Sequence, residues 1–300
     1  MQWYYIVLIF LLSVGLSVLI SIPIYFVHKT IHPFLSSRQE IIDAWKRDRF
    51  YTEYDKNIRK AINFKMNDGY IINGDYILAP GSKKFVVCVH GYTTNREAEM
   101  EYAHIFLRLG FSVIIYDQRG HGDNAPSKTM MGKIEALDLS TIIDQVYEKF
   151  GADIKIGLHG VSMGAATIML VTKYRQDFMF IIEDCGYIDF KSVVRKEVSN
   201  KHLPSWLFSP LIFIAARLVY HFNLNDASIK KDIKNIKVPT LIFHGTIDES
   251  VVISNAYYLN DNLECKHKLV EYRCKHANSL SDNREDYEKQ IKDFIKELNL

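Results

Sequence analysis

The stretch Leu158-His159-Gly160-Val161-Ser162-Met163-Gly164-Ala165-Ala166 is the one around which the rest of the chain is organised. An apolar run, 154–158, leads into it and predicts a strand, and the small residues that end it predict the start of a helix. Ser162 is therefore expected at a tight turn between a strand and a helix. Glycines at positions 160 and 164 keep this turn free of side chains that would crowd a strained backbone.

A serine at such a turn has two interpretations. Its hydroxyl can project from the edge of the sheet as a nucleophile, next to free N–H groups of the helix that suit an oxyanion. Alternatively, the serine only caps a helix after a glycine turn. The strand before Ser162 and the helix after it favour the first interpretation.

Strands and helices alternate along most of the chain on both sides of this turn. The expected strands are 61–65, 70–78, 85–90, 111–116, 154–158, 178–183, 238–245 and 268–272, and the expected helices are 97–109, 134–150, 163–174, 252–263 and 282–298. The first two strands are joined by Asn67-Asp68-Gly69, a strong hairpin signal. The alternation predicts an α/β domain with a mainly parallel sheet covered on both faces.

The alternation stops between residues 187 and 236, which we interpret as an insertion. It contains an apolar stretch, 211–220, preceded by Pro210, which fits the first turn of a helix. This stretch is too short to span a membrane. It is either a buried packing helix or a cap that lines an acyl pocket or rests on a bilayer.

The amino terminus is apolar and free of charged side chains from Trp3 to Val27. About 20 helical residues cross a bilayer core, and aromatic residues at both ends of this stretch fit the two membrane interfaces. A secretory signal peptide is the main alternative, but no Lys or Arg precedes the apolar run and no A-x-A-like cleavage site follows it. We therefore expect a transmembrane anchor at 1–28 and a helical, amphipathic connector at 29–60.

Basic residues follow the anchor and predict its orientation. They are Lys29, Arg38, Lys46, Arg47 and Arg49. The positive-inside tendency then places the rest of the chain on the cytoplasmic side.

Length and composition limit the class of protein. The 300 residues suit one large α/β domain with additions, and a net charge of +2 with 24% charged residues disfavours nucleic acid as a partner. The four cysteines have no metal-ligand spacing and are expected to be reduced thiols.

A carboxylate and a histidine follow later strands. Asp248 comes directly after the strand 238–245, and His276 lies in the loop after the last strand. Loops at the carboxyl ends of parallel strands converge on one side of the sheet, so both residues are expected near Ser162. Glu249 and Asp184 are alternatives for the carboxylate.

Four other histidines compete with His276 for the role of base. His90 and His159 end strands beside glycines and are expected to bond loop backbones, and His121 lies in a glycine-flanked turn, where a structural role is expected. His244 is the strongest rival, but it lies on the strand that leads to Asp248.

Five sequence features now form a common pattern. They are His90-Gly91-Tyr92, Tyr116-Asp117-Gln118-Arg119-Gly120-His121-Gly122, Gly160-Val161-Ser162-Met163-Gly164, His244-Gly245-Thr246-Ile247-Asp248 and His276. With them, the chain resembles the α/β-hydrolases of the esterase, lipase and serine aminopeptidase-like group. The resemblance extends over most of the chain from about Ala61 to Leu298 and is specific for the superfamily.

The resemblance implies an α/β-hydrolase domain at 61–300, with a small helical cap at about 187–236. It implies that Ser162 is the nucleophile, His276 the general base and Asp248 the carboxylate that orients it. Backbone N–H groups of Tyr92 and Met163 would form the oxyanion hole. No metal or other cofactor would take part.

The implied function is a serine hydrolase that cleaves carboxylic esters, since the apolar cap and the anchor both suit acyl chains. A serine peptidase of the aminopeptidase-like kind and an acyltransferase are alternatives on the same fold. A membrane-tethered binding protein without turnover is a further alternative, against which the intact motifs argue. Substrate identity, acyl-chain length and oligomeric state stay open.

Overall fold

The computed structural model describes residues 2–47 and 59–300, and an eight-stranded sheet lies at its centre. The strands are β1 (Lys60–Lys65), β2 (Ile71–Ile77), β3 (Lys84–Val89), β4 (Ser112–Tyr116), β5 (Lys155–Val161), β6 (Phe178–Asp184), β7 (Thr240–Gly245) and β8 (His267–Tyr272). They are arranged in the order β1-β2-β4-β3-β5-β6-β7-β8. The pairs β1–β2 and β2–β4 are antiparallel, and all the other pairs are parallel.

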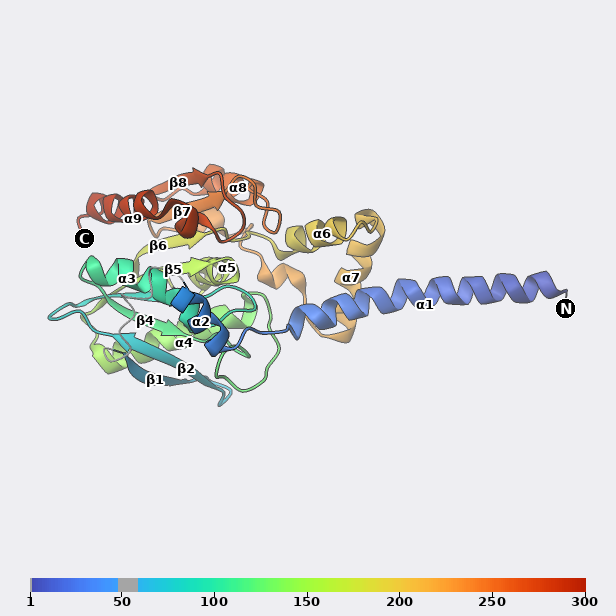
Figure 1. The fold of residues 1–300 in the computed structure, drawn as a ribbon, viewed down its shortest axis with the longest axis horizontal. Helices are drawn as coiled ribbons and strands as arrows, with labels where there is room; N and C mark the ends of the chain where they lie inside the picture. Colours follow the sequence, from blue (N-terminus) through green and yellow to red (C-terminus); the bar gives the residue numbers. More distant parts are fainter. Residues whose placement is uncertain (1, 48–58) are drawn as a thin grey trace.

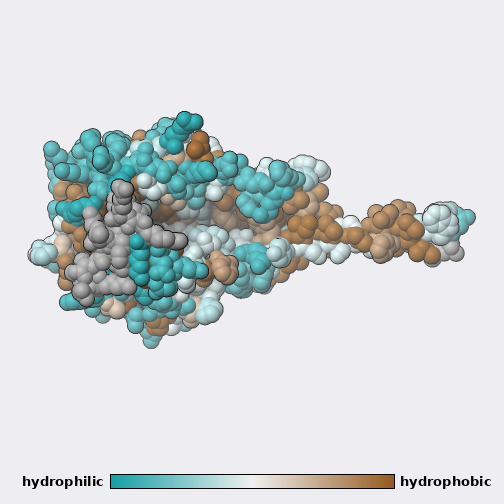
Figure 2. All heavy atoms as spheres, in the orientation of Figure 1, coloured by the Kyte–Doolittle hydropathy of each residue, from teal (hydrophilic) through white to brown (hydrophobic). Residues whose placement is uncertain are grey.

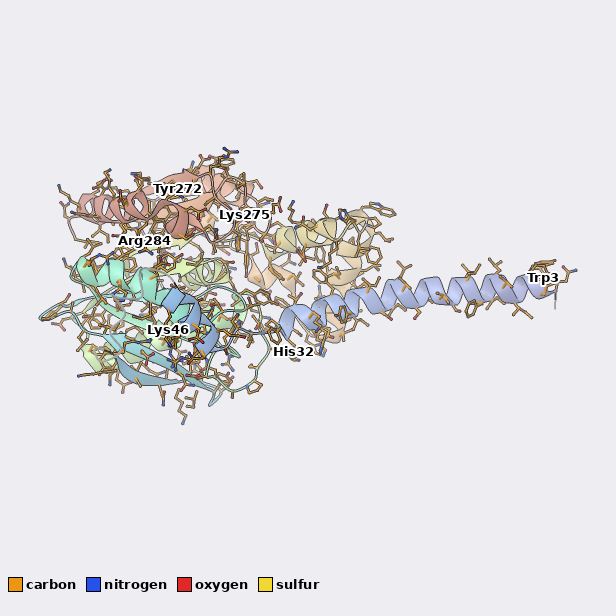
Figure 3. All side chains as sticks on the ribbon, in the orientation of Figure 1. Trp3, His32, Lys46, Tyr272, Lys275 and Arg284 are labelled. Carbon is orange, nitrogen blue, oxygen red and sulfur yellow. The ribbon has the colours of Figure 1, made fainter. Side chains whose placement is uncertain are left out.

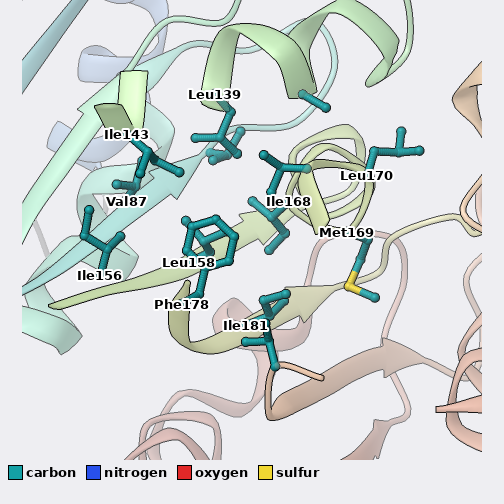
Figure 4. Packing of buried hydrophobic residues seen from close by; sticks show 14 of the residues in the cluster. Val87, Leu139, Ile143, Ile156, Leu158, Ile168, Met169, Leu170, Phe178 and Ile181 are labelled. Atoms are coloured by element: carbon teal, nitrogen blue, oxygen red, sulfur yellow. The ribbon is translucent and has the colours of Figure 1, made fainter. Parts of the chain in front are cut away.

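Helices cover both faces of the sheet (Figure 1). Those of the domain body are α3 (Met100–Arg108), α4 (Lys133–Phe150), α5 (Met163–Leu170), α8 (Ser254–Asn262) and α9 (Ser279–Glu297). Helices α4, α5 and α8 contribute buried residues to one core, and α3 and α9 contribute them to the other. Figure 4 shows the first core, where Leu139 and Ile143 of α4 and Ile168 of α5 gather over Ile156 and Leu158 of β5. Because β5 is covered on both faces, its end is held firmly in place.

The expected hairpin and the alternating order of strands and helices are confirmed. Gly69 has a positive φ of 82° in the turn between β1 and β2. The helix expected at 97–109 begins instead as a 3₁₀ helix, Arg96–Glu99, before α3. The side chain of Asn95 caps this start by accepting from the Glu97 N–H.

The insertion between β6 and β7 contains α6 (Phe190–Asn200) and α7 (Ser205–Val219). The expectation that Pro210 lies in the first turn of a helix is wrong, because α7 begins five residues earlier and encloses it. The ring of Pro210 lies on an exposed face of α7, opposite the buried residues Phe208 and Ile212. The apolar pattern of α7 therefore extends further than the stretch 211–220 suggested.

The amino terminus forms α1 (Trp3–Ile31), a 29-residue helix long and apolar enough to cross a membrane. It projects from the body at one end, and its inner part packs against α7 (Figure 1). The hydropathy colouring in Figure 2 is hydrophobic along most of the projecting helix.

The connector after α1 departs from the expected helix. Residues 33–37 are not helical; α2 (Arg38–Arg47) follows, and residues 48–58 lie outside the described part of the chain. In the non-helical part, the Ser36 N–H donates to the Thr93 carbonyl at 2.9 Å and the Asn95 amide donates to the Ser36 carbonyl at 3.1 Å. These bonds to a distant loop replace the bonds that a helix would make.

Candidate active site

Ser162 lies between the last residue of β5 and the first residue of α5, as expected. Its backbone is strained, with φ 56° and ψ −113°. A Cβ on Gly164 would lie 1.9 Å from the Val89 carbonyl oxygen, and one on Gly160 would lie 2.6 Å from the Gly164 backbone. Both positions therefore need glycine, which confirms the reason given for the two flanking glycines.

His276 and Asp248 meet at Ser162 although they come from distant loops. Asp248 follows β7, and His276 follows β8. His276 Nε2 lies 2.8 Å from Ser162 Oγ, and His276 Nδ1 lies 2.6 Å from Asp248 Oδ2. Figure 3 shows Lys275, the neighbour of His276, on the side of the body that faces α6 and α7.

Backbone donors hold the Asp248 carboxylate. Its Oδ1 accepts from the N–H groups of Ser250 and Val251, both at 2.8 Å. The carboxylate is fully buried, whereas the His276 side chain is 25% exposed. The imidazole is thus held at Nδ1 by a buried carboxylate, while its exposed part is accessible to a ligand.

The alternative carboxylates have other surroundings. Asp184 Oδ1 accepts from the Ser279 hydroxyl at 2.8 Å, and burial raises the pKa of Asp184 to about 6. Glu249 is exposed. The structure brings Asp248, rather than either of these, to the imidazole of His276.

Three of the four other histidines bond backbone groups. His90 contacts the Gly91 carbonyl at 2.7 Å, His121 contacts the Arg119 carbonyl at 3.0 Å, and His244 contacts the Val251 carbonyl at 2.7 Å. Burial lowers the pKa of His90 to about 3, so this ring is neutral.

The expectation that His159 bonds a loop backbone is wrong. Its Nε2 lies 3.2 Å from the Tyr287 hydroxyl, and its Nδ1 lies 3.4 Å from a Glu99 carboxylate oxygen. This difference arises because β5 places the buried ring beside Tyr102 and Phe106 of α3 and Tyr287 of α9.

The two residues expected to supply oxyanion donors flank the serine. Met163 is the first residue of α5, so its N–H has no partner within that helix. The loop that carries Tyr92 passes close by, since a Cβ on Gly91 would lie 3.5 Å from Ser162 Cβ. The Tyr92 hydroxyl donates to the Thr30 carbonyl of α1 at 2.8 Å, and burial raises the pKa of this hydroxyl to about 12.

A cleft of about 660 Å³ opens beside Ser162 and His276. Most of its lining is apolar or aromatic, and α6 and α1 contribute much of it. The residues from α1 are Ile22, Tyr25, Phe26, Lys29 and Thr30. Sequence reasoning missed these residues, since an apolar run that crosses a membrane and one that lines a cleft have the same composition.

Among the residues that the structure describes, two groups of side chains lie close enough to share a metal ion. They are Cys185, Asp248 and His276, and Cys88, Glu99 and His159. Burial raises the pKa of both thiols, which keeps them protonated and disfavours metal ligation. In the first group, His276 and Asp248 already bond each other.

Comparison with known proteins supports the fold. Residues 80–183 match the family described as serine aminopeptidase, S33. The uncharacterised protein YqkD of Bacillus subtilis strain 168 is 27% identical over 300 residues, which cover 96% of this chain and 97% of YqkD. The esterase Pf2001 of Pyrococcus furiosus superposes with a TM-score of 0.66 at 23% identity, covering 80% of this chain and 92% of that one. The esterase EaEST of Exiguobacterium antarcticum superposes with a TM-score of 0.58 at 18% identity, covering 78% and 98%.

The mainly parallel eight-stranded sheet, the strained serine turn and the superposed structures show that the chain has the α/β-hydrolase fold.

Proposed function

We propose that the chain is a serine hydrolase that cleaves carboxylic esters through an acyl-enzyme on Ser162. The observation that carries the proposal is the hydrogen-bonded series from Asp248 through His276 to Ser162, with distances of 2.6 and 2.8 Å. A base held by a carboxylate is what a serine hydroxyl needs in order to become a nucleophile.

In the proposed reaction, His276 Nε2 takes the Ser162 proton as Oγ attacks the ester carbonyl. The N–H groups of Tyr92 and Met163 stabilise the oxyanion, each contributing about 3 kcal/mol. His276 then gives its proton to the leaving alcohol. Water, deprotonated by the same imidazole, attacks the acyl-enzyme. The bond between the acyl carbon and Ser162 Oγ then breaks, Oγ takes the proton back from His276, and the acid is released.

The lining of the cleft supports esters over peptides as substrates. A serine aminopeptidase is the second candidate, favoured by the family match over residues 80–183. Such an enzyme needs a carboxylate to hold the free amine of its substrate. Glu197 lines the cleft, but its carboxylate is paired with Lys201 at 2.8 Å.

The proposal includes attachment to a membrane through α1, with the catalytic part on the cytoplasmic side. The length and hydropathy of α1 support the attachment. Lys29 in the last turn of α1, together with Arg38 and Lys46 after it, supports the orientation. Protease added to sealed inside-out membrane vesicles should degrade the domain. Degradation in right-side-out vesicles instead would show that the domain lies on the opposite side of the membrane.

A fluorophosphonate probe tests the nucleophile, because only an activated serine reacts rapidly with it. Wild type should be labelled and should hydrolyse p-nitrophenyl esters, and Ser162→Ala should lose both reactions. Ser281→Ala, which removes an exposed hydroxyl of α9, is the matched control and should keep both. If the folded wild-type protein is not labelled, Ser162 is not an activated nucleophile and the proposed mechanism is wrong. Faster cleavage of amino-acid anilides than of esters would favour the peptidase.

A further inference from the structure

Helix α7 presents an exposed face that is mostly apolar. Trp206, Pro210, Ile214 and Leu218 recur every four residues on this face and are all exposed, Trp206 by 79% and Leu218 by 69%. Residues on the opposite face, such as Phe208 and Ile212, are buried in a third hydrophobic cluster, to which α1 and α6 also contribute. The one charged residue of α7, Arg217, lies near its carboxyl end, where a long side chain can reach lipid headgroups.

The direction of α7 relative to α1 suits a membrane surface. In Figure 1, α7 runs across the axis of α1 rather than along it, at the end of the body from which α1 projects. The two helices pack against each other, and the Tyr220 hydroxyl, just after α7, donates to the Ile24 carbonyl of α1 at 3.4 Å. If α1 crosses a bilayer, α7 therefore lies in the plane of that bilayer.

The length of α1 sets the depth at which α7 lies. Every residue from Trp3 to Val18 is exposed, and contact with the body begins at Leu19 and Ile22. At about 1.5 Å per residue, the freestanding part is about 24 Å long, shorter than a hydrocarbon core of about 30 Å. A bilayer that covers the whole freestanding part therefore extends to the level where α1 meets α7.

The candidate active-site cleft begins at the same level. Ile22, Tyr25 and Phe26 of α1 form part of its wall, and Ser162 and His276 belong to the same cleft. A route lined largely by apolar side chains thus leads from the level of the membrane surface to the serine.

From this geometry we propose that α7 lies in the interface of the membrane that α1 crosses, and that the cleft takes an acyl ester directly from that leaflet. The substrate is an amphiphile whose acyl chain lies along α1 and whose ester group reaches Ser162. This inference rests on the proposed function and names its substrate class. The occupant of the exposed face of α7 is the lipid surface, because that face is continuous with the apolar surface of α1 (Figure 2).

The position of α7 can be measured with tryptophan fluorescence, independently of catalysis. The chain has three tryptophans, and the double variant Trp3→Phe/Trp45→Phe keeps only Trp206. In phosphatidylcholine and phosphatidylglycerol vesicles, lipids brominated near the top of the acyl chain should quench Trp206 strongly, and aqueous iodide should not. Quenching by iodide alone would overturn the proposal. Shielding from both quenchers, together with crosslinking between copies through α7, would also overturn it, because a second copy would then cover this face.

The substrate class is tested with two esters and the full-length reconstituted protein. Wild type should hydrolyse soluble p-nitrophenyl acetate and also 1-oleoylglycerol held in vesicles. Leu218→Asp, which places a charge on the exposed face outside the cleft, should lower the rate on the vesicle ester at least tenfold and leave the rate on the soluble ester within twofold. Leu137→Asp, at a similarly exposed apolar position on α4, is the matched control and should change neither rate.

The possible failures are distinguishable. A wild type that cleaves the soluble ester but not the vesicle ester, or a Leu218→Asp variant that cleaves both at the wild-type rate, overturns the inference and leaves the proposed function standing. A wild type that cleaves neither ester overturns the proposed function, and the substrate class falls with it. Trp206 quenching still decides where α7 lies.

Discussion

At the scale of single residues, the site depends on groups whose hydrogen bonds are fully determined. The buried Asp248 carboxylate accepts two backbone N–H bonds on one oxygen and contacts His276 with the other. The imidazole therefore has one orientation, with Nε2 directed at Ser162. A substitution at Asp248 that preserves the shape of the side chain but alters its hydrogen bonding should therefore disable the site.

Asp248→Asn is such a change. An amide nitrogen facing His276 Nδ1 donates a proton where a carboxylate accepts one, so the imidazole adopts the wrong tautomer. We expect kcat for p-nitrophenyl esters to fall by about 10⁴ with the fold intact. Asp184→Asn, at the rival carboxylate that accepts from Ser279, is the control and should have a much smaller effect on kcat. Equal losses in the two variants would contradict the assignment of Asp248.

A second prediction concerns Glu183, which is buried at the end of β6. Its Oε2 accepts from the Gly186 N–H at 2.9 Å, and burial raises its pKa from the ordinary 4.5 to about 8. Between these values the unfolded chain loses the proton that the folded chain keeps, so the free energy of unfolding falls as pH rises through this range.

Glu183→Gln removes that dependence and keeps an acceptor for Gly186. Calorimetry measures the Tm of the variant minus the Tm of wild type. This difference should increase from about pH 5 to about pH 8 and stay constant at higher pH. Glu285→Gln, at an exposed glutamate of α9, should show no such trend. A Glu183→Gln difference that is the same at about pH 5 and about pH 9 would show that the carboxyl does not titrate with the raised pKa.

At the scale of elements, a buried ion-pair cluster joins the loop after β3 to β2 and β4. The Arg96 guanidinium bonds Asp75 at 2.8 Å and Asp123 at 2.9 Å, and it also pairs with Asp117. Arg96 is only 5% exposed. The segment that begins with Tyr92 is therefore positioned by charges on β2 and in the loop after β4.

Arg96→Met should leave the buried Asp117 carboxylate without its ion-pair partner, which costs about 3–5 kcal/mol of stability. Chemical denaturation measures this loss. Lys83→Met breaks the exposed pair with Asp153 and should leave the free energy of unfolding nearly unchanged, because water screens that pair. A small effect of Arg96→Met would mean that water replaces the guanidinium.

Local sequence patterns predicted most elements correctly, and the errors occurred where distant residues intervene. The turn at Ser162 and the hairpin at Gly69 can be recognised from glycine positions in the local sequence, although the Val89 carbonyl of β3 also requires glycine at position 164. The connector after α1 was expected to be helical, but its residue Ser36 bonds the loop at Thr93 and is not helical. No pattern within 29–60 records that partner.

At the scale of the whole molecule, α1 has two parts with different surroundings. The outer part, from Trp3 to Val18, is exposed throughout, whereas the inner part packs against the cap and lines the cleft. Attachment to a membrane and formation of the site should therefore be separable by deletion.

Deletion of residues 2–18 should leave the folded domain and its rate on soluble esters within about twofold of wild type, since this segment lines no part of the cleft. Alkaline carbonate should then extract the shortened protein from membranes and should not extract the full chain. Deletion of residues 2–31 removes a wall of the cleft and the Thr30 partner of Tyr92, so it should lower both stability and ester hydrolysis. Resistance of the first variant to extraction would mean that α1 is not the anchor.

The sequence by itself determined the order of strands and helices, the glycine-flanked serine turn and the chemistry of the loops after β7 and β8. These depend on residue spacing along a single segment, where the backbone and its nearest side chains decide the outcome. Only the tertiary structure decided that α1 lines the cleft and that His159 bonds Tyr287 in the core. Such contacts join residues more than a hundred positions apart. In addition, the sequence of an apolar helix is the same whether lipid or protein surrounds its side chains.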